Sequence, residues 1–291
     1  MTRNDTALCF INKDIERIST QKPYVKEILD AFRPMIIEKK RLLMEMQSNG
    51  KTFPLDQGKY LAGVPLVQQC DLFFPGDPWQ KISLGVCKAI REGFPNLAEN
   101  MERLAQQITS GQVNVFEYFR SSDDPDEKEI KAWAEKIPMD PGALGVFIHM
   151  AAGIILAKRA REAAEAIASL SWSKGYCPVC GSFPMLAVTK ERGEKWLQCS
   201  QCSHEWVHPR LKCPYCEQES PMGTDVVFVD TEKEDKAFLC DKCKKYLITI
   251  NRPAELEKTD PIITAIGLTH LDLLLQEKGF TPMASCLWNA F

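Results

Sequence analysis

Apolar residues recur every three or four positions over much of the first 170 residues, which is the period of an amphipathic helix. Residues 23 to 47 show the pattern well, because Tyr24, Ile28, Phe32, Met35 and Ile36 fall on one face. Pro34 is predicted to kink this helix. Further helices are predicted at about 79 to 92, 96 to 109, 112 to 120 and 126 to 136, between breaks that contain proline or glycine.

The longest predicted helix runs from Pro141 to about Leu170. Its first half is apolar on all sides and its second half is amphipathic, as expected for the central helix of a bundle. The apolar run from Gly142 to Ala157 is shorter than the roughly 20 residues that span a bilayer, and it contains His149. We therefore expect a buried helix and no membrane insertion.

Helical periodicity stops near Ser171, where glycines, cysteines, aromatic and β-branched residues take over. The pattern predicts an α+β multidomain protein with an all-α N-terminal bundle, two tandem zinc-ribbon or rubredoxin-like modules and a C-terminal helix. The expected boundaries are 1–172, 173–210, 211–252 and 253–291.

A single helix is predicted over residues 259 to 280. Asp260 can cap its first amides, Pro261 suits its first position and Gly279 can close its last turn. The stripe Ile263, Ile266, Leu271, Leu274 and Leu275 is expected to pack back on the rest of the protein. His270 beside this stripe is interpreted as a boundary residue and not as a ligand.

Composition excludes few functions. The 291 residues are 45% hydrophobic and 26% charged, with a formal net charge of -3, so no general electrostatic footprint for nucleic acid exists. The first twenty residues lack the uninterrupted apolar core of a signal peptide, and we expect a cytoplasmic protein.

Twelve cysteines change the picture, because thiols stay reduced in the cytosol and clustered thiols then indicate metal. Eight of them form four Cys-x-x-Cys pairs: Cys177/Cys180, Cys199/Cys202, Cys213/Cys216 and Cys240/Cys243. Two such pairs surround one ion tetrahedrally, so the sequence predicts two metal ions, one for each four-cysteine site. Cys9, Cys70, Cys87 and Cys286 are scattered and receive no role.

Spacing alone leaves three pairings of these motifs open: sequential, central and interleaved. An internal repeat favours the sequential one. YCPVC precedes KWLQCSQC and HEWVH, and KCPYC precedes AFLCDKC and KKYLITI. Each half thus reads as Cys-Pro-x-Cys, a loop, a short strand into Cys-x-x-Cys, and a second strand with Trp206 or Tyr246. We expect Cys177, Cys180, Cys199 and Cys202 at one site and Cys213, Cys216, Cys240 and Cys243 at the other.

Each half has too few apolar residues for a stable core, so we expect bound metal to be obligatory for folding. Four cysteines complete the coordination shell, which leaves no open position for hydrolytic chemistry. His204 and His208 are therefore interpreted as strand residues. The ligand set suits zinc and iron equally.

The same residues resemble a known family. The runs CPVCGSFP, LQCSQCSHEW, RLKCPYCEQES, CDKCKKYL and LDLLLQEKGF resemble, in this order, signatures of the formate dehydrogenase accessory proteins of the FdhE type. The similarity covers roughly residues 170 to 291. It implies two rubredoxin-like modules that bind iron or zinc. It also implies a non-enzymatic cytoplasmic maturation factor, or chaperone, that binds the catalytic subunit of a molybdenum- or tungsten-containing formate dehydrogenase.

Two other functions compete with this assembly role. A nucleic-acid-binding zinc ribbon is disfavoured because residues 172 to 251 hold 11 basic and 11 acidic residues, and each divalent tetrathiolate adds a charge of about -2. A rubredoxin-like electron-transfer or thiol redox protein would need iron or a reactive CPYC motif, but Ser220, Pro221 and Gly223 disfavour the helix that such a motif begins. No candidate active site emerges from the four scattered histidines.

Overall fold

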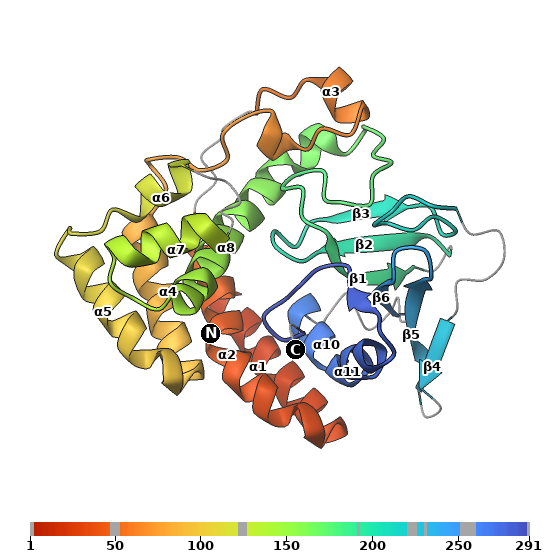
Figure 1. Ribbon diagram of the computed structural model, residues 1–291, viewed down its shortest axis with the longest axis horizontal. Helices are drawn as coiled ribbons and strands as arrows, with labels where there is room; N and C mark the ends of the chain where they lie inside the picture. The colour runs from red at the N-terminus through yellow and green to blue at the C-terminus, as the bar shows by residue number, and fades with distance from the viewer. Residues whose placement is uncertain are drawn as a thin grey trace.

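Helices form the N-terminal part of the protein and one sheet forms much of the rest, as the computed structural model shows (Figure 1). The structure describes residues 3–46, 53–121, 127–190, 193–219, 226–229, 232–250 and 260–289. Within these ranges the predicted fold class is confirmed: a helical region precedes a sheet that carries two four-cysteine clusters.

The bundle is built around α8, which packs against α2, α4 and α7. Its helices are α1 (Arg3–Gln21), α2 (Lys26–Glu45), α3 (Gln57–Leu61), α4 (Trp79–Gly93), α5 (Ala98–Thr109), α6 (Val115–Ser121), α7 (Glu127–Lys136) and α8 (Pro141–Ile167). Short 3-10 turns lie at η1 (Pro23–Val25), η2 (Leu66–Gln68) and η3 (Pro95–Leu97). The helices predicted from periodicity are confirmed, and Pro34 lies inside α2.

Helix α1 was not predicted from the sequence. Ile11, Ile15 and Ile18 of this helix are buried and lie three or four residues apart, so the signal was present in the sequence. The charged residues between them hid it. Buried against α2, these side chains extend the bundle core.

Helix α8 is long and apolar enough to cross a membrane by length and composition, with a mean hydropathy of 1.5 in its most apolar window. In the structure 67% of that window is buried inside the protein. Asp140 caps its first turn by accepting a hydrogen bond from the amide of Ala143 at 2.8 Å. The buried core helix that the sequence predicted is the one observed.

The sheet joins both cysteine-rich segments. Its strands are β1 (Pro184–Thr189), β2 (Lys195–Cys199), β3 (Glu205–His208), β4 (Val226–Val229), β5 (Glu232–Cys240), β6 (Lys245–Ile250) and β7 (Thr281–Pro282). The order is β3-β2-β1-β6-β5-β4, with β7 on β6. Neighbours within each cysteine-rich segment are antiparallel. The two segments meet through a parallel pairing of β1 with β6, in which Ala187 lies opposite Thr249.

The repeat seen in the sequence is therefore a three-stranded antiparallel unit, β1-β2-β3 and then β4-β5-β6. Two of its strands were not predicted, because β1 and β4 fall where a loop was expected. Most of β1 is buried, so its residues do not alternate between apolar and polar types. A short apolar run of this kind is ambiguous without its neighbours.

The C-terminal segment corrects the prediction of one continuous helix, because it contains two: α10 (Pro261–Ile266) and α11 (Thr269–Glu277). The break lies at Gly267 and Leu268, where the amide of Leu268 bonds three residues back to the carbonyl of Ala265 and tightens the last turn of α10. The predicted ends are confirmed. Asp260 accepts from the amide of Ile262 at 2.9 Å, and Gly279 has a φ of +82°.

Candidate metal centres

Each Cys-x-x-Cys pair closes a tight backbone turn. The residue that follows the second cysteine donates its amide hydrogen to the carbonyl of the first in three of the turns: Gly181 to Cys177 at 3.0 Å, Glu217 to Cys213 at 3.0 Å and Lys244 to Cys240 at 2.8 Å. These turns bring both sulfurs of a pair to one side of the backbone, as a metal knuckle requires.

The same position carries a left-handed backbone in all four turns. The φ angles are +78° at Gly181, +59° at Ser203, +58° at Glu217 and +54° at Lys244. Among the described residues, the last three are the non-glycine residues with positive φ. A left-handed residue with a side chain costs roughly 1–2 kcal/mol. The turns therefore keep a left-handed backbone at Ser203, Glu217 and Lys244, although a residue with a side chain disfavours it.

The first centre gathers Cys177, Cys180, Cys199 and Cys202. The Sγ atoms of Cys177 and Cys202 lie 3.5 Å apart, and those of Cys180 and Cys199 lie 3.4 Å apart. Backbone amides point at the sulfurs, since Val179 N lies 3.4 Å from Cys177 Sγ and Gln201 N 3.4 Å from Cys199 Sγ. Three of the four cysteines are buried, and Cys180 is half-buried.

The second centre gathers Cys213, Cys216, Cys240 and Cys243. Its Sγ atoms are 3.9 Å apart for Cys213 and Cys243 and 3.7 Å apart for Cys216 and Cys240. Cys216 and Cys243 are half-buried, so this centre is closer to solvent than the first. Within each centre, all four sulfurs lie within 4.8 Å of one another. The structure therefore brings the cysteines together in the sequential pairing.

The sulfur geometry fits a tetrahedral ion. With metal–sulfur bonds of about 2.3 Å, the edge of a regular tetrahedron is about 3.8 Å, close to the distances observed and well beyond the roughly 2.05 Å of a disulfide. Burial raises the pKa of Cys177 well above its ordinary value and that of Cys213 to about 11, so uncompensated thiolates are unfavourable at both places. A bound cation supplies the missing compensation, and these residues fit a zinc or iron ion.

The two knuckles that open the modules touch each other. Lys174 forms an ion pair of 3.0 Å with Glu217, and the rings of Phe183 and Tyr215 lie 4.8 Å apart. Gly175 lies so close to Pro214 that an added Cβ would stand 1.9 Å from the carbonyl oxygen of Pro214. These contacts fix the centres relative to one another, beyond what the shared sheet does.

The histidines lie outside both sulfur clusters. His208 is buried in β3 and its Nδ1 lies 3.1 Å from the carbonyl oxygen of Pro209, while burial lowers its pKa to about 4. His204 precedes β3 and stacks with Trp206. His270 lies 3.2 Å from the hydroxyl of Tyr24, and His149 is in α8. None of them joins the sulfurs of a described cluster.

Lys39 was not among the residues predicted to lie near a metal centre. This residue of α2 directs its Nζ to the Ser203 hydroxyl in the second knuckle of the first centre, at 3.3 Å. Burial lowers the pKa of Lys39, and the nearby Asp260, Cys202 and Cys199 oppose that effect. The contact joins residues 164 positions apart, and no local pattern in the chain marks it.

Comparison with known proteins identifies the relatives of this architecture. The family model described as "FdhE, central domain" matches residues 176–210, which contain the first centre. The curated Protein FdhE of Escherichia coli O127:H6 is 26% identical over 209 residues, which is 69% of this chain. Protein FdhE of Escherichia fergusonii matches equally well. The chain is therefore similar to FdhE proteins, most specifically in the segment that holds the first centre.

The match spans 62% of the length of these FdhE relatives, so part of each relative lies outside it. The crystal structure of the FdhE protein from Pseudomonas aeruginosa is 19% identical to this chain, with a TM-score of 0.65. It covers 99% of this chain and 97% of its own. This likeness establishes that the two chains share a fold.

Proposed function

We propose that this protein is a cytoplasmic, non-catalytic maturation factor. It binds the catalytic subunit of a molybdenum- or tungsten-containing formate dehydrogenase and promotes its assembly or activation. The eight cysteines hold two ions of iron or zinc, and the metal-stapled sheet forms a rigid docking platform for that subunit.

The observation that carries the proposal is the pair of closed four-cysteine clusters on one sheet. Four sulfur ligands leave no coordination position for a substrate, so a structural use of the metal accounts for the sites better than hydrolytic catalysis does. A metal that links β2 to the turn before β1, and β5 to the turn before β4, stiffens strands whose own apolar core is small. Similarity to the FdhE proteins supports the choice of partner.

Co-purification tests the partner. The full chain, expressed with a tagged formate dehydrogenase catalytic subunit, is expected to co-elute with it. The Cys199→Ser/Cys202→Ser variant is expected to lose that complex, because the sheet can no longer hold the first metal ion. A Cys87→Ser variant is the matched control, since Cys87 is buried in α4 and far in sequence from the clusters. Absence of the subunit from the wild-type eluate would refute the proposal.

Elemental analysis tests the metal. Protein purified without air is expected to contain two equivalents of zinc or iron per chain and to lose one in each pair variant. Iron with a reversible potential would favour the electron-transfer alternative over a purely structural one. Folded protein without metal would contradict the structural role of the sites.

A further inference from the structure

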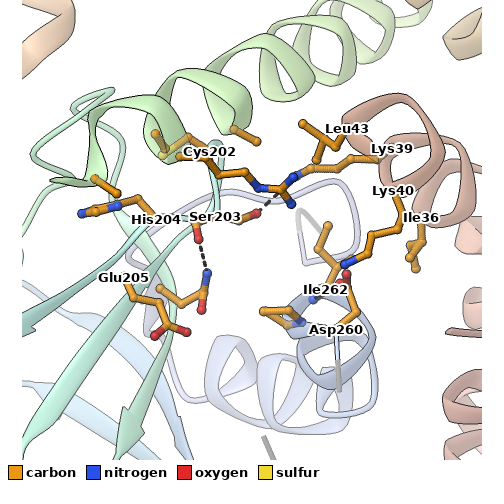
Figure 2. Close-up of a pocket in the computed structure, with 16 residues that line it drawn as sticks. Ile36, Lys39, Lys40, Leu43, Cys202, Ser203, His204, Glu205, Asp260 and Ile262 are labelled. Carbon is orange, nitrogen blue, oxygen red and sulfur yellow. Dashed lines mark hydrogen bonds between the residues drawn. The ribbon is translucent and has the colours of Figure 1, made fainter. Parts of the chain in front are cut away.

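A cavity of about 330 Å³ lies between the helical bundle and the first metal centre. Figure 2 shows Lys39, Lys40, Ile36 and Leu43 on the α2 side, Ser203, His204 and Glu205 opposite them, and Asp260 and Ile262 on the α10 side. Helix α8 adds Ala157, Ala160, Arg161 and Ala164. Four parts of the chain that are distant in sequence thus line one open cavity.

Three cations line this cavity: Lys39, Lys40 and Arg161. In the part of the chain that the structure describes, none of the three forms an ion pair, although most other basic residues of the bundle do, such as Arg41 with Glu45. Lys39 and Lys40 are half-buried. Like charges that lie near one another repel, and an anion bound between them would offset that repulsion.

Both acidic residues that line the cavity have a partner besides its cations, and Asp260 also acts electrostatically on Lys39. Asp260 accepts the amide hydrogen of Ile262 as the cap of α10, and Glu205 pairs with Lys190 at 3.1 Å. The sulfurs of Cys199 and Cys202 act electrostatically on Lys39. Because one direct anionic partner is lacking for each of Lys40 and Arg161 among the described residues, the cavity has the character of an anion site.

The remaining lining is apolar. Ile36, Leu43, Ala157, Ala160 and Ile262 present hydrocarbon to the same space. Ligand cavities in proteins measure roughly 300–1,000 Å³ and combine an apolar lining with a few polar groups. Two ammonium groups and one guanidinium suit the several oxygens of a phosphate better than the two oxygens of one carboxylate.

We propose that this cavity binds a small organic phosphate, with the phosphate between Lys39, Lys40 and Arg161 and the organic part against the apolar wall. This binding site is separate from the partner-docking role and does not depend on it. Because Ser203 belongs both to the cavity and to a metal knuckle, ligand binding and the first metal centre share a wall.

Calorimetric titration of the metal-loaded full chain with phenyl phosphate tests the proposal, at constant ionic strength held with sodium chloride. Saturable one-to-one binding is expected, tighter than that of inorganic phosphate, which lacks the apolar part, and tighter than that of benzoate. Lys40→Gln and Arg161→Gln are each expected to weaken binding about tenfold or more, since each removes a charge-assisted hydrogen bond. Lys40 is half-buried and Arg161 is exposed, so circular dichroism and metal content should stay unchanged.

Lys88→Gln is the matched control, because Lys88 is an exposed lysine of α4 that pairs with Glu92 at 3.9 Å and does not line the cavity. It is expected to bind phenyl phosphate like the wild type. Equal weakening in all three variants, or no saturable binding in the wild type, would overturn the site. Benzoate binding as tight as phenyl phosphate would overturn the phosphate specificity. None of these results bears on the formate dehydrogenase proposal, because that proposal is tested by co-purification.

Discussion

Arg159 of α8 and Asp77 form an ion pair in which both side chains are fully buried, 82 residues apart in sequence. The guanidinium also donates to the carbonyl oxygen of Leu72 at 2.8 Å and to Glu162 at 3.0 Å. Asp77 in turn accepts the amide hydrogen of Phe74 at 3.0 Å. One buried arginine thereby fixes the loop before α4 onto the central helix.

Removing the cation of this pair is expected to be strongly destabilising. Arg159→Met leaves the Asp77 carboxylate buried without its partner and should lower the free energy of unfolding by about 3–5 kcal/mol. Urea denaturation of the metal-loaded protein measures the loss. The double variant Arg159→Met/Asp77→Leu should lose less than the sum of the single variants, by about 1–3 kcal/mol. Strict additivity would show that the pair is not coupled.

An exposed ion pair provides the comparison. Lys88 and Glu92 are 69% and 51% exposed, and Lys88→Gln should change the free energy of unfolding by less than about 1 kcal/mol. A large loss of stability at Arg159 and a small one at Lys88 would show that burial of the ion pair sets the size of the effect.

The two metal centres are expected to release metal at different rates. Cys216 and Cys243 are half-buried, whereas Cys177, Cys199 and Cys202 are buried, so a chelator should reach the second centre first. Release followed with a chromophoric chelator should show two phases. Cys213→Ser/Cys216→Ser should abolish the fast phase and Cys177→Ser/Cys180→Ser the slow one. The reverse assignment would contradict the order of accessibility seen in the structure.

The left-handed positions of the knuckles predict opposite effects of glycine and alanine. Gly181→Ala should destabilise the protein by about 1–2 kcal/mol. Its Cβ would meet Pro65 at an ordinary 3.6 Å, so the cost is conformational and not steric. Lys244→Gly should be more stable than Lys244→Ala by about 1 kcal/mol. Thermal unfolding of the metal-loaded variants measures both, and equal stabilities at position 244 would argue against strain there.

Asp272 predicts a pH dependence. This carboxyl is buried beneath the Tyr246 hydroxyl, which donates to it at 2.6 Å, and burial raises its pKa from 3.8 to about 6. Because the folded state then binds the proton more tightly than the unfolded state, its contribution to stability falls as pH rises from about 4 to 6. A shift of about two pKa units corresponds to about 3 kcal/mol.

Asp272→Asn should therefore be more stable than the wild type above pH 7, and the difference between them should shrink as the pH falls toward 5. Urea denaturation of both proteins from pH 5 to 8 measures this difference, and loss of metal at low pH affects both alike. A constant difference across that range would show that Asp272 does not titrate in it.

The features that could be predicted from the sequence are those set by local spacing. The period of Phe32, Met35 and Ile36 marks α2, and the repeat of Cys-x-x-Cys motifs marks the two clusters. Apolar β1 was missed because a strand buried over most of its length shows no alternation, and the break at Gly267 because one stripe continues from Ile263 to Leu271 across it. At β1 the local sequence fits a loop as well as a strand, and at Gly267 it fits one continuous helix as well as two.

The features that could not be predicted depend on contacts between distant parts of the chain. Lys39 reaches Ser203 across 164 positions, and Arg159 reaches Asp77 across 82. Neither lysine nor arginine stands out in a sequence with 36 basic residues. The cavity between α2, α8 and the first centre arises only when these elements are packed together.

The parallel pairing of β1 with β6 means that the two repeats are not structurally independent modules. Excising residues 176–210 would remove the strand that pairs with Thr249 and Ile250 and leave that part of the β6 edge unpaired. Edges of that kind recruit strands from other molecules. A protein that lacks one repeat would therefore tend to aggregate through the other. The two repeats have to be kept or removed together.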